Sequence, residues 1–318
     1  MPGPMIHVTP TDAISRRLPG AVLILAAMTV LHTGSALATR FFDDVGAAGT
    51  TWLRVSFAAL LLLALTGRSL WPVLRSTPRA DLSAALLLGA ASGGMMLLFS
   101  ESAARIPLGT ATALEFLGPL AVAVAASRRP RELAWLALAA AGVLLLTSPW
   151  TGGVGLAGVL FGLAAGVCWA LYVIGTQHIG SRFSAQHGLA VSLTAAALFT
   201  APFGAPQVVA APRWGVIAAV AGIAVLMPLV PYLLEMKALQ RIGSTAYGTL
   251  VGMEPAVSLL AGMVLISQIP TAVQAAGTAL VVVAGIGAAR AERRAPGGSR
   301  EVTRRSSSTP SCPAEPSR

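Results

Sequence analysis

Ten long apolar runs constrain the fold of this chain more than any other feature of its sequence. An α-helix needs about 20 mostly apolar residues to cross the hydrocarbon core of a bilayer, and each run is close to that length. Charged residues, glycines or prolines separate one run from the next. The runs therefore predict ten transmembrane helices, at approximately 20–39, 46–66, 82–103, 107–127, 132–149, 154–177, 186–204, 214–236, 242–266 and 270–289.

The overall composition also indicates a membrane protein. Hydrophobic residues make up 55% of the chain and charged residues 11%, which leaves too little polar surface to cover a large soluble globule. Residues 1–18 are expected to form a short cytoplasmic segment. Residues 291–318 are rich in Arg, Ser, Pro and Gly and are expected to form a disordered, basic cytoplasmic tail. The predicted fold class is an all-α integral membrane protein.

The basic residues are distributed as the loops of a membrane protein distribute them. Alternate loops, counted from the N-terminus, hold 18 of the 22 Lys and Arg residues, while only Arg40, Arg105 and Arg213 fall in the opposite set. Because cytoplasmic loops carry an excess of Lys and Arg, both termini are predicted to be cytoplasmic, with the chain in the cell (inner or plasma) membrane. The net charge of +10 is not gathered on one basic face, so no nucleic-acid partner is expected.

Two segments of the chain resemble each other. Residues 105–126 and 241–262 align with five identities, among them Pro119 with Pro255. Each segment is preceded by three predicted spans and followed by one, which makes two five-helix units at 19–149 and 150–290. A repeated unit with an odd number of spans must invert, and inverted repeats are common in secondary transporters. Chance similarity between helices rich in Ala, Gly and Leu is the alternative.

Two acids, Glu115 and Glu254, lie in the middle of predicted spans. A charge there costs about 2.5 to 3.5 kcal/mol, so such residues normally face a bundle interior or a wet cavity. When the repeats are superposed on Pro119 and Pro255, the acids fall three positions apart, on nearly the same helical face. The two prolines are predicted to interrupt their helices and to leave carbonyl groups free along a path. Alternatively, Arg54 or a hydroxyl group satisfies each acid as a packing device.

Five further side chains are candidates for a substrate or proton pathway. Arg54 is the basic residue deepest in a predicted span, and it needs either a glutamate or a substrate carboxylate as counter-charge. Glu235 lies near a cytoplasmic end, where snorkelling or pairing is an equally good explanation. Trp169 and Tyr172 lie three residues apart on one face, which suits core packing or an interfacial belt as well as substrate contact. His32 either titrates near neutral pH or simply packs in the bundle.

Three segments of the chain resemble the drug/metabolite transporter superfamily, and within it the EamA-type threonine/homoserine exporters. They are IPLGTATALEFLGPLAVAVAASRRP, GVCWALYVIG and PYLLEMKALQRIGSTAYGTLVGMEPA. The resemblance covers about residues 20 to 290 and implies a ten-helix carrier built from two inverted EamA repeats. It also implies that Glu115, Glu254, Arg54 and the segment from Pro231 and Tyr232 to Glu235 occupy family positions, with Pro231 as a further helix break.

The chain departs from the family pattern at two places. The third span reads GGMMLLFSES where similar exporters often carry polar or aromatic groups, and Gln268 stands where many EamA repeats have Gly-Glu. A lining that contains Met95, Met96 and Leu97 suits a less polar metabolite better than threonine. These departures concern the substrate and leave the expected fold unchanged.

The sequence favours a secondary exporter of threonine-like or homoserine-like amino acids, or of related small metabolites. No GxxxxGK[ST] loop is present, so proton antiport with alternating access is the expected energy source. Burial and a neighbouring guanidinium act in opposite senses on the pKa of a carboxyl group, so an intramembrane acid can be tuned to exchange protons. The alternatives are an exporter of less polar, drug-like compounds and a channel-like facilitator without proton coupling.

The chain is not expected to be an enzyme. Its four histidines, His7, His32, His178 and His187, are scattered over the N-terminal segment, the spans and a loop, and they form no HExxH or similar site. We therefore expect no catalytic residue, no metal site and no cofactor. The expected partners are a small-molecule substrate, protons and the lipid bilayer, and a homodimer is left open.

Overall fold

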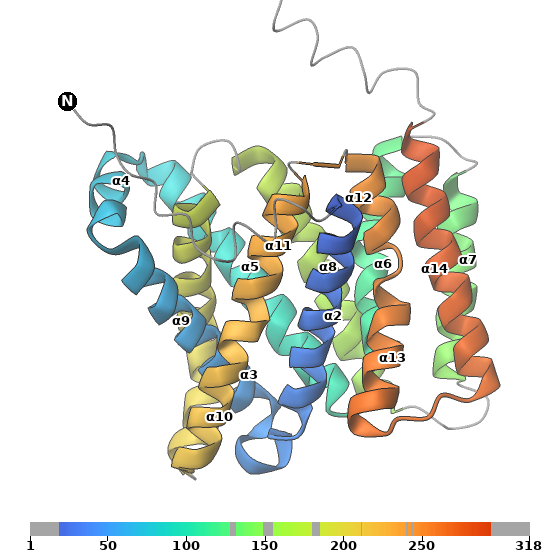
Figure 1. Ribbon diagram of the computed structural model, residues 1–318, viewed down its shortest axis with the longest axis horizontal. Helices are drawn as coiled ribbons and strands as arrows, with labels where there is room; N and C mark the ends of the chain where they lie inside the picture. The colour runs from blue at the N-terminus through green and yellow to red at the C-terminus, as the bar shows by residue number, and fades with distance from the viewer. Residues whose placement is uncertain are drawn as a thin grey trace, which may run out of the picture.

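The described residues form a bundle of α-helices, shown in Figure 1. The computed structural model describes residues 19–127, 132–148, 155–179, 185–210, 212–239, 241–242 and 244–293. Within these ranges, nine helices or continuous helical segments are long and apolar enough to cross a membrane. The main elements are α2 (Gly20–Thr39), α3 (Phe42–Thr66), α5 (Arg79–Ala103), α6 (Leu108–Ser127), α7 (Leu133–Thr147), α8 (Leu156–Ile179), α9 (Ala185–Ala210), α10 (Trp214–Ala224), α11 (Val230–Leu239), α12 (Ser244–Val251), α13 (Glu254–Ile266) and α14 (Ala272–Arg293).

Each of the ten predicted apolar runs is occupied by helical residues. The shortest run forms α7, an apolar helix of 15 residues. The eighth run is divided among α10, the π-helical stretch η4 (Val225–Leu229) and α11, and the ninth between α12 and α13. The short helices η1 (Gly67–Ser69) and α4 (Leu70–Ser76) lie between α3 and α5, where the sequence predicted no element. The predicted segment 1–18, and the predicted tail beyond Arg293, lie outside the described residues.

The helices pack across the two halves of the chain as well as within each half. Helix α3 packs on α9, α6 on α13, and α7 on α14. Helix α5 packs against both α8 and α9, while α2 packs against α11, α12 and α13. The start of α2 and the end of α14 lie at the same end of the bundle, at the top of Figure 1. Helices from both halves thus enclose the centre of the molecule.

Helices α6 and α8 approach each other at a pair of glycines. A Cβ atom on Gly118 would overlap the carbonyl oxygen of Gly166, and one on Gly166 would lie 2.9 Å from the carbonyl oxygen of Glu115. Small residues at a helix interface let the backbones come close enough for many weak contacts. This contact fixes the height of Glu115 relative to the aromatic residues of α8.

The helix break predicted at Pro119 does not occur, because α6 is continuous through this residue. A proline inside a helix removes one hydrogen bond, here to the carbonyl of Glu115, and the helix continues where its neighbours accommodate the loss. The close approach of Gly166 to that carbonyl provides such a neighbour.

Two other prolines do stand beside irregular backbone. Pro255 occupies the first turn of α13, directly after a turn at residues 252–253 that separates α12 from α13. Proline suits that position because the first N–H groups of a helix have no partner within it. Pro231 follows η4, in which Met227 has non-helical φ and ψ angles. Irregular stretches of this kind expose backbone and redirect side chains in membrane proteins.

Candidate functional site

A cavity of about 250 Å³ lies among helices of both halves, and it collects most of the intramembrane charges. Elements α2, α3, α5, α6, α8, η4, α11, α12 and α13 all contribute to its walls. The lining residues are Met28, Leu31, His32, Ser35, Arg54, Met95, Met96, Phe99, Glu115, Trp169, Tyr172, Met227, Glu235, Tyr247, Val251 and Glu254. We call this space the charged cavity.

Seven of the eight side chains predicted from the sequence line the charged cavity: Glu115, Glu254, Arg54, Glu235, Trp169, Tyr172 and His32. The eighth, Tyr232, lies one turn before Glu235 on α11 and is half-buried, but it is not among the lining residues. Met95 and Met96 also line the cavity, whereas Leu97 faces a different hollow. The tertiary structure thus brings together residues that are up to 222 positions apart in the chain.

Glu254 is the first residue of α13, where an acidic side chain is favoured because the helix N-terminus carries partial positive charge. Its Oε1 atom lies 3.5 Å from Nε2 of His32, which α2 supplies. Both side chains are buried, yet neither ring nitrogen of His32 nor Oε2 of Glu254 has a hydrogen-bond partner in the described part of the chain. The two groups are therefore in contact without an optimal hydrogen bond.

Arg54 of α3 is also buried, and it lines the same cavity. Its Nη1 atom donates to the sulfur of Met227 at 3.2 Å, and the hydroxyl of Ser35 donates to the same sulfur at 3.5 Å. Arg54 and Glu115 interact electrostatically, although no ion pair between them is found among the described residues. The expected counter-charge is thus nearby without forming a direct salt bridge.

Two further acids share the electrostatic field of the cavity. Glu115, in the middle of α6, interacts electrostatically with Glu254 at the start of α13. Glu235 on α11 also lines the cavity, and the hydroxyl of Tyr247 donates to its Oε2 at 3.4 Å. Three carboxyl groups and one guanidinium therefore face a small internal space, an arrangement typical of ion and substrate pathways in membranes.

Trp169 is held against the cavity by an aromatic neighbour. Its ring packs edge to face with Phe116, with centroids 6.4 Å apart and an interplanar angle of 68°. Phe116 directly follows Glu115 and belongs to the buried core. The aromatic pair thus ties the orientation of Trp169 on α8 to the helix that carries Glu115.

Polar contacts join neighbouring helices on one side of the acids. The hydroxyls of Thr112 and Ser258 lie 2.7 Å apart, and Ser258 also contacts the carbonyl oxygen of Leu108 at 3.3 Å. The backbone N–H of Leu108 donates to Oε1 of Gln268 at 2.9 Å. Arg40, at the end of α2, donates to the carbonyl oxygen of Leu265 at 2.6 Å. We call these contacts the polar closure, which joins α2, α6 and α13.

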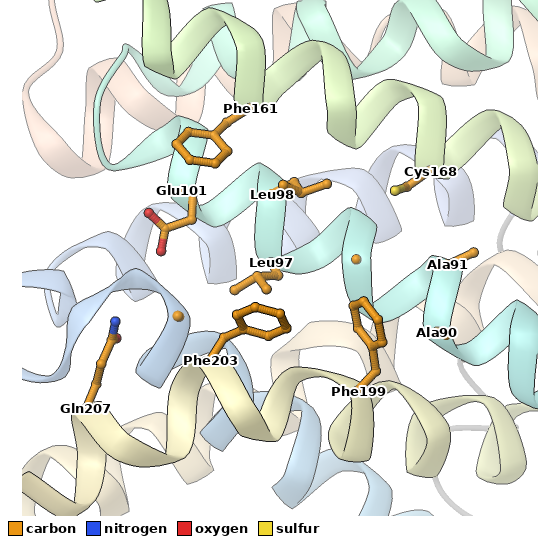
Figure 2. A pocket seen from close by; sticks show the side chains of 12 residues that line it. Ala90, Ala91, Leu97, Leu98, Glu101, Phe161, Cys168, Phe199, Phe203 and Gln207 are labelled. Carbon is orange, nitrogen blue, oxygen red and sulfur yellow. The ribbon is translucent and has the colours of Figure 1, made fainter.

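A second and larger hollow, of about 600 Å³, lies along α5 between α8 and α9. Figure 2 shows Phe203 of α9 next to Leu97 of α5, with Glu101 and Gln207 at one end of the space. Glu101 forms an ion pair with Arg105, four residues further along the chain. This hollow is apolar over most of its length and lacks the charge cluster, so the charged cavity is the better candidate site.

Three of the lining residues that sequence reasoning missed make polar contacts at the charged cavity: Tyr247, Ser35 and Met227. Tyr247 lies seven residues before Glu254, about two helical turns, and that spacing could have indicated that both residues line the same cavity. Ser35 lies three residues after His32 and therefore on the same helix face. Met227 had no comparable signal, because the non-helical backbone within η4 decides where its sulfur lies.

An all-helical membrane bundle with a buried charge cluster between its two halves defines the class of protein as a membrane transporter. Residues 156–289 match the EamA-like transporter family. The chain is 37% identical, over 291 residues, to the threonine/homoserine exporter RhtA of Salmonella typhimurium (strain LT2), covering 89% of this chain and 96% of that protein. It is 38% identical to the threonine/homoserine exporter RhtA of Escherichia coli (strain K12), over 279 residues that cover 86% and 92% of the two chains.

The chain belongs to the EamA family of the drug/metabolite transporter superfamily. It is a multi-pass membrane protein, and its relatives are transporters and not enzymes. One solved crystal structure superposes with a TM-score of 0.59 at 19% identity, over 88% of this chain and 98% of the other. That likeness concerns the fold alone.

Proposed function

We propose that this protein exports threonine, homoserine or related amino acids from the cytoplasm, by proton antiport with alternating access. The observation that carries the proposal is the charged cavity, in which Arg54 faces Glu115 and Glu254 within a small space enclosed by both halves of the chain. The relatives are threonine/homoserine exporters by name. An amino acid carries both an anionic and a cationic group, and the cavity offers partners for both.

The architecture we propose is two inverted five-helix repeats, at residues 19–149 and 150–290, with α7 as the fifth of ten spans. The packing of the helices supports it. Under this scheme α3 corresponds to α9, α6 to α12 with α13, and α7 to α14, and the members of each pair pack on one another. The contact of α5 with α8 has its counterpart in the contact of α11 with α2. Pairing of this kind is what a pseudo-two-fold axis through the bundle produces.

We place both termini in the cytoplasm of a cell-membrane protein. The asymmetry of Lys and Arg between alternate loops supports this orientation. The start of α2 and the end of α14 lie at the same end of the bundle, as an even number of spans requires (Figure 1). The polar closure then belongs to the external side, because it includes Arg40, at the C-terminal end of α2, and Leu265, at the C-terminal end of α13.

In the proposed alternating access, the charged cavity opens first to one side of the membrane and then to the other. We propose that the polar closure shuts the cavity toward the outside, while Glu235 and Tyr247 lie toward the cytoplasmic ends of α11 and α12. Rocking of one repeat against the other would break the contact of Thr112 with Ser258 and form a matching closure on the cytoplasmic side. The closed end favours a carrier over a channel-like facilitator.

Protons are the proposed coupling ion. A glutamate facing outward takes up a proton, and the neutral side chain then crosses at a lower electrostatic cost than a carboxylate. Substrate arriving from the cytoplasm displaces that proton, so export is driven by inward proton flow. We assign the coupling role to Glu254, whose Oε2 has no partner within the described chain, and a counter-charge or substrate contact to Glu115.

A less polar substrate is the second candidate. Four methionines line the charged cavity, at Met28, Met95, Met96 and Met227, and methionine adapts to varied apolar shapes. Such a substrate would leave Arg54 without an anionic ligand, which is why we rank it below an amino acid.

Counterflow in proteoliposomes tests the proposed function. Vesicles are loaded with unlabelled threonine, homoserine, other amino acids or a lipophilic cation, and entry of each labelled compound is followed with and without an imposed pH gradient. We expect threonine or homoserine to exchange, and a proton gradient to drive net flux. Exchange of the lipophilic cation alone would replace the proposal with the second candidate.

A further inference from the structure

Two sets of polar atoms in the charged cavity lack strong hydrogen-bond partners. The first consists of donors: Nη1 of Arg54 and the hydroxyl of Ser35, both directed at the sulfur of Met227. A thioether sulfur is a weak acceptor. Both residues are buried, with exposures of 3% and 5%. An anionic oxygen at the position of the sulfur would accept stronger hydrogen bonds from these two donors.

The second group consists of Glu254 and His32. Oε2 of Glu254 and both ring nitrogens of His32 have no hydrogen-bond partner within the described ranges, and the residues are only 8% and 3% exposed. Buried polar atoms are nearly always paired in native proteins, and an unpaired one at a cavity wall needs an explanation. A donor that carries positive charge would satisfy the carboxylate oxygen and the free imidazole nitrogen together.

The two groups are neighbours across one small space. Ser35 belongs to the first group and His32 to the second, and both project from the same face of α2 because they lie three residues apart. Side chains at that spacing have Cβ atoms about 5 to 6 Å apart. All four residues therefore line the same cavity, and its volume of about 250 Å³ suits one small molecule.

We infer that the charged cavity binds a zwitterionic α-amino acid in one fixed orientation, with its carboxylate at Arg54 and Ser35 and its ammonium group at Glu254 and His32. This inference rests on the proposed function and adds the arrangement of the substrate to it. The reverse orientation would place the ammonium group against Arg54 and the carboxylate against Glu254, with repulsion at both ends.

The other charged groups of the cavity fit this arrangement. Glu115 interacts electrostatically with Arg54 and supplies its counter-charge when no substrate is bound. A substrate carboxylate at Arg54 takes over that role. Glu235 already accepts a hydrogen bond from the Tyr247 hydroxyl, whereas Oε2 of Glu254 has no hydrogen-bond partner in the described part of the chain, so Glu254 is the better acceptor for the ammonium group.

Competition binding tests the orientation. The full-length protein in lipid nanodiscs is incubated with radiolabelled threonine, and two analogues compete: threoninamide, which lacks the carboxylate, and 2,3-dihydroxybutanoate, in which a hydroxyl replaces the ammonium group. For the wild-type protein, we expect each analogue to bind at least about tenfold more weakly than threonine, since each loses a charge-assisted hydrogen bond.

The variants should separate the two ends of the substrate. Arg54→Gln and the milder Ser35→Ala should reduce the preference for threonine over threoninamide, while the preference over 2,3-dihydroxybutanoate remains. Glu254→Gln and His32→Gln should show the opposite pattern. Cys168→Ala, on α8 at the wall of the second hollow, is the control and should keep both preferences.

The possible results lead to different conclusions. The crossed pattern would establish the orientation, because damage to the fold lowers the affinity for all three compounds together. Equal losses for threonine and both analogues in the variants that remain folded would overturn the inference while leaving amino-acid export intact. If the wild-type protein binds no amino acid under conditions in which its fold is retained, the inference and the proposed function both fail.

Discussion

The hydroxyl oxygens of Thr112 and Ser258 lie 2.7 Å apart and join α6 to α13, one helical turn from Glu115 and Glu254. The bond places a polar contact between equivalent helices of the proposed repeats. Together with the bond from Leu108 N–H to Gln268, it belongs to the polar closure, which we propose shuts one end of the path to the two acids. Any substrate that passes out on this side has to separate these helices.

Locking this contact should stop transport. In a Cys168→Ala, Cys312→Ala background, the pair Thr112→Cys and Ser258→Cys is expected to form a disulfide under mild oxidation, because the two side chains already meet. Threonine exchange in proteoliposomes should fall to background and return after reduction. Each single cysteine variant is the control. Full exchange by the oxidised pair, with cross-linking verified by mass spectrometry, would mean that the polar closure does not open during transport.

Neutralising the two acids should separate proton coupling from substrate exchange. Glu254→Gln is expected to abolish efflux driven by a pH gradient while keeping part of the exchange without a gradient, because an amide cannot carry the proton. Glu115→Gln is expected to weaken exchange itself, since Arg54 loses its counter-charge. Both activities are measured with labelled threonine in the same vesicles. If both variants retain full pH-driven transport, the acids are packing devices and the assigned proton mechanism is wrong.

The glycine contact between α6 and α8 should be sensitive to a single methyl group. Gly118→Ala places a Cβ atom against the backbone of Gly166, so we expect a loss of about 1 to 3 kcal/mol in stability and a lower melting temperature. Gly222→Ala is the matched control, because no atom lies within 4 Å of its Cβ position and alanine is the better helix former. Thermal unfolding of both variants in the same detergent provides the comparison. Equal melting temperatures would contradict the proposed role of this contact.

Reporter fusions test the topology. A reporter placed after Ala126 or after Arg290 should give a cytoplasmic signal, and one inserted within 151–155 should give an external signal. The reason is the excess of Lys and Arg in the loops assigned to the cytoplasm. A cytoplasmic signal from the insertion within 151–155 would remove the basis of the inverted repeat, whatever the other two reporters show.

The sequence by itself determined the helical runs and most of the charges at the site. Burying an apolar residue in a bilayer, or a charge such as Arg54 or Glu115, has a free energy that depends mainly on that residue and its depth. Hydropathy therefore located the apolar helices, and the rarity of intramembrane charges singled out Glu115, Glu254 and Arg54, which the charged cavity brings together. The same reasoning failed at Pro119, because whether a helix tolerates proline depends on a neighbour such as Gly166.

Only the tertiary structure decided which polar groups meet. The pairing of His32 with Glu254, the contact of Arg54 and Ser35 with Met227, and the hydrogen bond of Thr112 with Ser258 join residues 146 to 222 positions apart. Serine, threonine and methionine are common in membrane helices, so their presence alone gives no signal. Their partners are set by the relative heights and rotations of packed helices, and by local irregularities such as η4. Those features arise from the sum of many weak contacts across the bundle, which no single stretch of sequence contains.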